Sequence, residues 1–291
     1  MTARARSFGL VCGILPPGPL NAITDVAGVR VGHHTVRIGD VLTGFTAVLP
    51  HDGDLFRSKV RAGVDIINGF GKSAGLIQVA ELGQIETPIL LGNTLSVGTG
   101  FNALVSRTLA ANADIGRTTG TINPVVLECN DGWLSDIRAR ALTEADALRA
   151  LDAAETGPVA EGAIGAGAGM SAFGFKGGVG TASRTVTLDG RDHVLGVLAL
   201  ANFGNAGDLV LPDGRCRPAG RIAAGRNAVR SSSSLRPTSP WRRASSSASP
   251  AAAAQALPAS APSGVMAAAT SRSPSRPPAG STTTRPAISS R

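Results

Sequence analysis

The sequence has only three cysteines, no apolar run long enough to cross a membrane, and no acidic residue after Asp213. The cysteines, at positions 12, 129 and 216, are scattered and odd in number. This excludes a disulfide framework or a paired-cysteine metal site and suits a reducing cytoplasm. A membrane helix needs about 18 consecutive apolar residues, and residues 1–13 lack the apolar run and cleavage site of a secretory signal. We therefore expect a cytoplasmic protein that does not bind membranes.

The charge changes sign along the chain. Residues 214–291 contain twelve Arg but no Asp, Glu or Lys, so they carry +12, which leaves −4 on residues 1–213 of a chain whose net charge is +8. Ser, Ala, Pro and Arg fill 57 of the 78 tail positions, and such a segment buries too little apolar surface to offset its ordering entropy. We predict an acidic folded body over residues 1–213 and a disordered basic tail over residues 214–291.

The body has the patterns of a mixed α/β protein. Short β-branched runs predict strands at Val29–Val31, Phe45–Leu49, Ile89–Leu91, Val125–Leu127, Arg184–Leu188 and Val194–Ala201. Apolar residues at helical spacing predict helices at Ser73–Leu82, Thr99–Ala111 and Thr143–Ala154. Thr143 followed by Asp146 resembles a capping pair for the last of these helices. Two glycine clusters, between residues 162 and 169 and between residues 174 and 180, predict loops with close backbone approach.

Several short motifs do not meet the requirements of cofactor or metal sites. Gly71-Lys72-Ser73 lacks the glycine that a phosphate-binding loop needs five positions earlier, where Ile66 stands. The glycines at 165, 167 and 169 do not have the dinucleotide-binding spacing. His33 and His34 are adjacent on a predicted strand, so their side chains point to opposite faces and do not form a metal pair. We therefore expect no cofactor and no metal.

An ordered series of motifs nevertheless resembles the DmpA-type aminopeptidases, which include the D-aminopeptidases and β-peptidyl aminopeptidases. The series runs from about Leu20 to Asp213, and its ordered length makes it far more specific than one short motif. The matching segments include Asn21–Val26, Gly28–His33, Asn68–Gly71, Thr87–Leu91, Asn93–Gly98, Asn123–Val126, Asn130–Leu134, Gly165–Met170, Phe175–Thr181 and Ala201–Gly204. Lys72 departs from the pattern, because the family usually has an acidic residue there.

The resemblance implies an α+β fold, a four-layer αββα sandwich of the DmpA and ornithine acetyltransferase type, here incomplete at the C-terminus. It implies a precursor that cleaves itself before a Ser, whose freed α-amine, with a pKa of about 7.7–8.0, then serves as general base. By motif match Asn202 assists the oxyanion hole, although its residue type alone would suggest a turn at the end of a strand. Trp133 matches an aromatic substrate-binding position, with core packing as the alternative. The implied partners are a small peptide or amino-acid amide substrate and further copies of the same chain.

The nucleophile expected from the resemblance is missing. The family has Gly-Ser before a β-branched strand of Ile and Val and a later Gly-His-Gly-Ser-Gly turn, and neither occurs after Asp213. If Ser231–Ser234 are encoded by TCG codons, reading from the third base of each gives Val-Val-Val. The same frame, with plausible codons, restores the Gly-His-Gly-Ser-Gly turn around Met266. We hypothesise a frameshift between Asp213 and Arg226 that splits the nucleophile codon between Val229 and Arg230, so that the chain as written is inactive.

Two other functions remain open from the sequence. The +12 tail could bind nucleic acid by counterion release, although it has few aromatic residues to stack on bases and charge runs are usually solvated. An acyltransferase related to ornithine acetyltransferase would share the fold but use a Thr nucleophile, and the body motifs fit it poorly. A self-processing serine aminopeptidase or amidase, acting on peptides, amides or esters with a free amino end, is the favoured interpretation.

Overall fold

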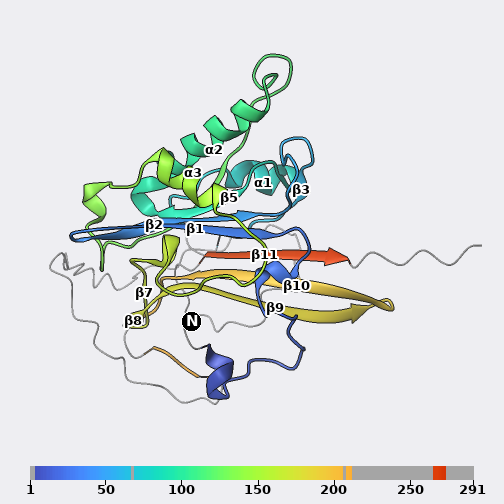
Figure 1. The fold of residues 1–291 in the computed structure, drawn as a ribbon, viewed down its shortest axis with the longest axis vertical. Coiled ribbons are helices and arrows are strands. Elements are labelled where there is room, and N and C mark those ends of the chain that lie inside the picture. The colour runs from blue at the N-terminus through green and yellow to red at the C-terminus, as the bar shows by residue number, and fades with distance from the viewer. Residues whose placement is uncertain (1–3, 67–68, 206–207, 212–264, 273–291) are drawn as a thin grey trace, which may run out of the picture.

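Two stacked β-sheets with helices on one outer face form the core of the molecule (Figure 1). The structure is a computed structural model that describes residues 4–66, 69–205, 208–211 and 265–272. The first sheet contains, in spatial order, β1 (Arg30–Ile38), β2 (Val41–Leu49), β5 (Ile89–Asn93) and β6 (Val125–Cys129). The second contains β11 (Val265–Arg272), β10 (Arg191–Ala201) and β9 (Gly178–Leu188).

The remaining elements are shorter or lie outside these two sheets. The α-helices are α1 (Leu76–Leu82), α2 (Val97–Ala111) and α3 (Glu144–Asp152). There are two small two-stranded sheets among the described residues. One pairs β3 (Val60–Arg61) with β4 (Gln84–Ile85), and the other pairs β7 (Ser171–Ala172) with β8 (Phe175–Lys176). Single turns of 3₁₀ helix occur at η1 (Ala5–Phe8), η2 (Ile23–Asp25), η3 (Thr94–Ser96), η4 (Ile137–Ala139) and η5 (Gly165–Gly167).

Strand β2 lies between two separate hydrophobic clusters. Phe45 and Leu49 belong to the cluster under α2 and α3, whereas Val48 belongs to the cluster between the two sheets, together with Leu198 of β10. Successive side chains of a strand point to opposite faces, so one strand contributes to both clusters. This explains why β2 is buried along most of its length and why its apolar run does not alternate with polar residues.

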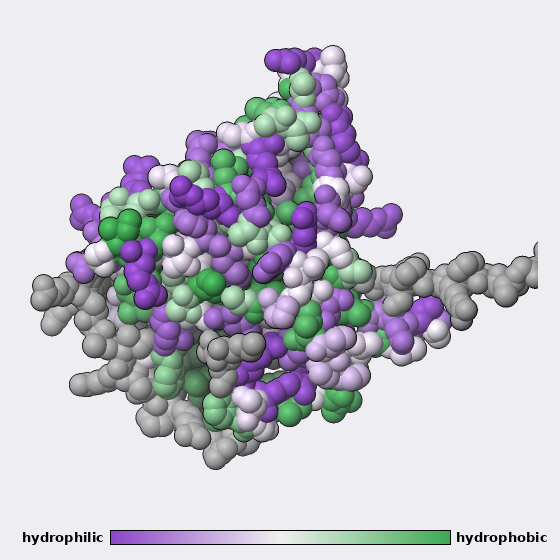
Figure 2. Space-filling view, viewed as in Figure 1, coloured by the Kyte–Doolittle hydropathy of each residue, from purple (hydrophilic) through white to green (hydrophobic). Residues whose placement is uncertain are grey.

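The helices predicted from the sequence all form, and their packing follows from the first sheet. Helix α3 begins at the predicted cap: the Thr143 hydroxyl accepts from the backbone N–H of Asp146, and the Asp146 carboxylate accepts from the backbone N–H of Thr143 at 2.9 Å. Ala147 and Leu151 of this helix are buried under the sheet. In Figure 2 the outer side of the helical layer is largely hydrophilic, with hydrophobic residues in small groups.

The first glycine cluster fills the space between the sheets. Turn η5 contacts strands of both sheets, and Gly165 there has a φ of +52°. Its backbone N–H donates to Thr35 Oγ1 at 2.7 Å. A Cβ atom at Gly165 would lie 2.5 Å from Thr46 Oγ1, so a glycine is required for the backbone to approach the strands this closely. The predicted close approach is therefore confirmed at this turn.

The described layers correspond to the first three of the αββα sandwich: helices, first sheet, second sheet. The basic tail, residues 214–291, lies outside the described residues apart from β11. Strand β11 differs from the expected disorder, since residues 265–272 pair antiparallel with β10 along eight positions. Strand β10 offers a free row of backbone N–H and C=O groups, and the segment Val265–Arg272 contains no proline or glycine that would prevent pairing. Within the described part of the chain, no helix is both long and apolar enough to span a membrane.

Candidate active site

Asn202 follows directly after β10 and joins two loops through its side chain. Its Nδ2 donates to the backbone carbonyl of Asn130 at 2.9 Å, and its Oδ1 accepts from the backbone N–H of Ser171 at 3.2 Å. These two bonds fix which end of the amide is the donor. The amide nitrogen carries two hydrogens and the bond to Asn130 uses one. The Asn202 side chain therefore links the loop after β6 to β7.

The loop Asn130–Trp133 follows β6 and lies beside Asn202. The Asn130 Oδ1 accepts from the backbone N–H of Gly132 at 2.8 Å, a local turn that leaves the Asn130 carbonyl to Asn202. Trp133 is 43% exposed. The Trp133 side chain is therefore not part of the buried core, and its role in binding a substrate stays a prediction.

A buried carboxylate at the end of β6 was not identified from the sequence. Glu128 is 9% exposed, and its Oε1 accepts from the backbone N–H of Lys72 at 2.9 Å while its Oε2 accepts from the Thr94 hydroxyl. Strands β5 and β6 are parallel, so their carboxyl ends, and the loops that follow them, lie at the same edge of the sheet. Glu128 therefore provides a negative charge at the edge from which the Asn130–Trp133 loop starts.

Asp131, also missed by the sequence analysis, is fully buried beneath that loop. Its Oδ2 accepts from the Thr43 hydroxyl at 2.5 Å, and Thr43 Oγ1 in turn accepts from Asn93 Nδ2 at 3.0 Å. Burial raises the pKa of Asp131 to about 6, because desolvation disfavours the charged form. The motif Asn-Asp-Gly reads in the sequence as an exposed turn, and only the tertiary fold shows that the carboxylate points inward.

Lys176 holds the glycine-rich turn against the start of β9. The ammonium donates to the carbonyls of Gly167 and Met170 at 2.9 Å each and of Gly177 at 2.8 Å. Although the residue as a whole is exposed, burial of its ammonium, followed by repulsion from Arg37, lowers the pKa of Lys176 to about 8. With three hydrogens directed at three carbonyls, Lys176 fixes the backbone that leads into Ser171, the partner of Asn202.

The adjacent histidines point to opposite faces of β1, as predicted. His33 Nδ1 lies 2.9 Å from Thr46 Oγ1 on the side of the glycine turn, whereas His34 Nε2 lies 3.1 Å from the Asp146 carboxylate of α3. Among the residues that the structure describes, no cluster of three or more His, Cys, Asp or Glu could hold a metal ion. Val229 and Arg230, where we placed the split nucleophile codon, lie outside the described residues.

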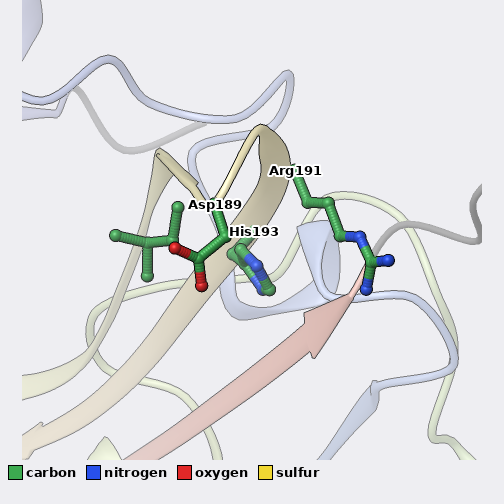
Figure 3. A pocket seen from close by; sticks show the side chains of 4 residues that line it. Asp189, Arg191 and His193 are labelled. Carbon is green, nitrogen blue, oxygen red and sulfur yellow. The ribbon is translucent and has the colours of Figure 1, made fainter.

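A shallow pocket at the β9–β10 turn is separate from this site. It is lined by Leu188, Asp189, Arg191 and His193 (Figure 3), and Figure 3 shows these side chains projecting from one hairpin. Strand β10 runs from Arg191 to Ala201, and at about 3.3 Å per residue its two ends are roughly 30 Å apart. The pocket therefore lies far from Asn202.

Comparisons with known proteins agree with the resemblance seen in the sequence. The model of "Peptidase family S58" matches residues 21–269. A β-peptidyl aminopeptidase of Sphingosinicella microcystinivorans is 44% identical over 210 residues, which are 69% of this chain and 52% of that protein. The chain thus spans about half the length of this curated relative.

Solved structures show the same fold. A β-aminopeptidase of a Burkholderia species has a TM-score of 0.67 at 44% identity, covering 72% of this chain and 60% of that one. The L-aminopeptidase D-Ala-esterase/amidase of Ochrobactrum anthropi, a prototype of the serine aminopeptidases with a variant of the Ntn hydrolase fold, has a TM-score of 0.66 at 39% identity, covering 72% and 60%.

These matches confirm the predicted family and fold, and they support neither the nucleic-acid-binding nor the acyltransferase alternative. The sequence matches agree with the motifs, and the structural matches agree with the arrangement of the two sheets. On this evidence the chain belongs to peptidase family S58.

Proposed function

We propose that this chain carries the body of a self-processing serine aminopeptidase that releases N-terminal residues from peptides, amides or esters. The observation that carries the proposal is the fixed amide of Asn202, held by hydrogen bonds to Asn130 and Ser171. A preorganised donor of this kind stabilises the oxyanion of acyl transfer. The names of the relatives agree with hydrolysis at a free amino end.

Each described residue of the site would have a separate role in binding or catalysis. Asn202 would donate to the developing oxyanion, and Trp133, exposed in the loop whose first residue contacts Asn202, would contact the side chain of the substrate. Glu128, a buried carboxylate at the same sheet edge, would attract the free ammonium of the substrate. The nucleophile would be a Ser freed by self-cleavage, whose own α-amine accepts the hydroxyl proton near neutral pH.

We also propose that the chain as written lacks this nucleophile because the reading frame changes between Asp213 and Arg226. The alignment with the Sphingosinicella relative covers 69% of the chain, which leaves a part about as long as the basic tail. The family model, by contrast, matches up to residue 269. Its end therefore does not coincide with the proposed change of reading frame between Asp213 and Arg226. The loss of every Asp, Glu and Lys after Asp213 is the stronger support.

Sequencing the coding DNA across the codons for Asp213 to Arg230, and then assaying both reading frames, tests the proposal. The corrected chain should cleave itself into two fragments and hydrolyse amino-acid p-nitroanilides, whereas the chain as written should do neither. In the corrected chain, Asn202→Ala should lower kcat by about 10²–10³-fold, the usual cost of one oxyanion donor. An uncleaved corrected chain without hydrolysis would overturn the proposed function, and turnover by the chain as written would overturn the frameshift.

Two further expectations are proposals of the same kind. A cytoplasmic location is supported by the few scattered cysteines, of which Cys12 is exposed and Cys129 is buried. Association into homo-oligomers is supported by exposed apolar side chains near the N-terminus, where Phe8 is 72% and Ile14 is 99% exposed. Light scattering of the corrected chain at several concentrations would measure its oligomeric state, and a monomer at all of them would refute the second expectation.

A further inference from the structure

The pocket at the β9–β10 turn is built on a regular hairpin. Strands β9 and β10 pair antiparallel in unbroken register up to Leu188 and Arg191, and Asp189 and Gly190 form the two-residue turn between them. The φ values of these two residues are +51° and +70°, as in a type I′ turn, whose twist matches that of paired strands. The side chains that line the pocket therefore project from a backbone that is paired on both sides of the turn.

The charges on the pocket side of the hairpin are not used within the fold. The side chains of Asp189, Arg191 and His193 make no hydrogen bond or ion pair with any described residue. Asp192 is next to Arg191 on the strand, so it points to the opposite face, and there its carboxylate accepts from the Thr187 hydroxyl at 2.7 Å. The hairpin thus satisfies the carboxylate on one face and leaves the charged groups of the other face to a ligand.

The pocket presents one negative and one positive group that are held apart. Figure 3 shows the carboxylate of Asp189 and the guanidinium of Arg191 on opposite sides of the His193 ring. A carboxylate accepts the hydrogens of an ammonium, and a guanidinium donates two parallel N–H bonds to a carboxylate. A molecule that carries both an ammonium and a carboxylate would therefore complement the two groups.

The size and the apolar wall of the pocket narrow the class of ligand. Its volume is about 300 Å³, at the lower end of the range for small-molecule sites, which suits a single amino acid better than a longer peptide. Leu188 lines the same pocket and is 54% exposed. An apolar ligand side chain that covers Leu188 would remove apolar surface from water on both molecules.

We propose that this pocket binds a free amino acid with an apolar side chain, its ammonium on Asp189, its carboxylate on Arg191 and its side chain against Leu188. The site lies at the end of β10 opposite to Asn202, so it is separate from the candidate active site. A free amino acid is also what an aminopeptidase releases, but binding at the hairpin requires no nucleophile and does not rest on the proposed function.

Titration of L-leucine into the full-length chain as written, followed by ligand-observed NMR near neutral pH, tests the proposal. We expect saturable binding with a Kd on the order of 1 mM, because both charged contacts are open to water. N-acetyl-leucine lacks the ammonium and leucine amide lacks the carboxylate. Each should bind about tenfold more weakly, since each loses one charge-assisted contact.

Variants of the hairpin show where the amino acid binds. Asp189→Asn and Arg191→Gln change exposed side chains, so the fold should persist while the affinity for leucine falls about tenfold in each. Asp192→Asn, on the opposite face of the same hairpin, is the matched control and should bind leucine as the unmodified chain does. Absence of saturable binding, equal binding of the three ligands, or an affinity unchanged by both pocket variants would overturn the proposal.

A fourth variant separates this inference from the proposed function. Glu128→Gln alters the carboxylate assigned to the substrate ammonium at the candidate active site and should leave leucine binding at the hairpin unchanged. If leucine binding is lost in Glu128→Gln and kept in Asp189→Asn, the amino acid occupies the candidate active site. That result would refute the hairpin site while supporting the proposed function. Failure of hydrolysis by the corrected chain, in contrast, would leave binding at the hairpin unaffected.

Discussion

Two buried titratable residues oppose each other in the pH dependence of stability. Asp131 has its pKa raised by burial to about 6 from an ordinary value of 3.8. His33 has its pKa lowered by burial to about 4 from 6.5, and its Nε2 has no partner among the described residues. Both groups prefer to be neutral in the fold, which for the carboxyl means protonated and for the imidazole means deprotonated.

The two groups contribute slopes of opposite sign to the free energy of unfolding as a function of pH. Between pH 3.8 and about 6 the folded protein holds the Asp131 proton more tightly than the unfolded chain, so this contribution is complete below pH 3.8 and is lost as pH rises to 6. Between about pH 4 and 6.5 the unfolded chain holds the His33 proton more tightly. That contribution is complete above pH 6.5 and is lost as pH falls to 4.

Urea unfolding between pH 4.5 and 6 should separate these contributions. Asp131→Asn should make the free energy of unfolding rise more steeply with pH than in the unmodified chain, by up to about 1.4 kcal/mol per pH unit. His33→Gln should make the free energy of unfolding rise less steeply with pH than in the unmodified chain, by a similar amount. Asp189→Asn should run parallel to the unmodified chain. If all four curves are parallel, neither group titrates as its burial requires.

The residues of the site differ in how far a sequence reveals them. Asn202 and Trp133 could be named because their motifs match a family, and the pair Thr143 and Asp146 because a capping box is local. Glu128 and Asp131 could not, because their burial is produced by β2, β5 and the glycine turn, which are distant in sequence. Their residue types alone suggest exposed charges, and only tertiary contacts reverse that expectation.

At the scale of elements, the start of helix α3 depends on Thr143. Its hydroxyl caps the helix, and the helix packs on β1 and β2 through Ala147 and Leu151. Thr143→Ala should lower the free energy of unfolding by about 1 kcal/mol, the usual cost of losing such a cap. Thr121→Ala, at an exposed position outside the helices and strands, should change it by less than about 0.5 kcal/mol. Equal effects in urea unfolding would contradict the role of the cap.

The glycine turn packs against the loop of the candidate site through Gly169. A Cβ atom there would lie 2.3 Å from the Leu42 carbonyl oxygen and 2.8 Å from the Asp131 Cβ. Gly169→Ala should therefore destabilise the fold by about 1–3 kcal/mol through overpacking and lower the thermal midpoint by several degrees. Gly98→Ala is the matched control, since that glycine lies in α2 with open space around it. It should stabilise the protein slightly, and a loss equal to that of Gly169→Ala would show that packing at the turn is not the cause.

Elements inside the body were predictable because their signals are local. The β-branched runs at Phe45–Leu49 and Val125–Leu127 became parts of β2 and β6, and the helical spacing at Thr99–Ala111 became α2. Which strands pair could not be derived this way, since the neighbours β2 and β5 are separated by 39 residues of chain. Strand β11 was missed because nothing in the composition of its surroundings distinguishes it from the rest of the tail.

At the scale of the whole molecule, β11 protects the edge of the second sheet. Strand β10 pairs with β9 on one side and with Val265–Arg272 on the other. Without β11, one row of β10 backbone groups would face solvent, and an exposed strand edge favours pairing with another molecule. In the chain as written, the basic segment after Asp213 therefore has one part that contributes to the fold.

Two truncations should separate this contribution from that of the remaining tail. A chain ending at Arg272 keeps β11, and we expect its amide hydrogen exchange in β10 to match that of the full chain. A chain ending at Asp213 removes β11, and we expect faster exchange for those β10 amides that pair with it, with self-association rising with concentration in light scattering. Strand β9 should keep its protection in both, because its pairing with β10 is continuous from Gly178 to Leu188. Unchanged exchange in β10 after truncation at Asp213 would mean that β11 does not protect this edge in solution, and the second sheet would then end at β10.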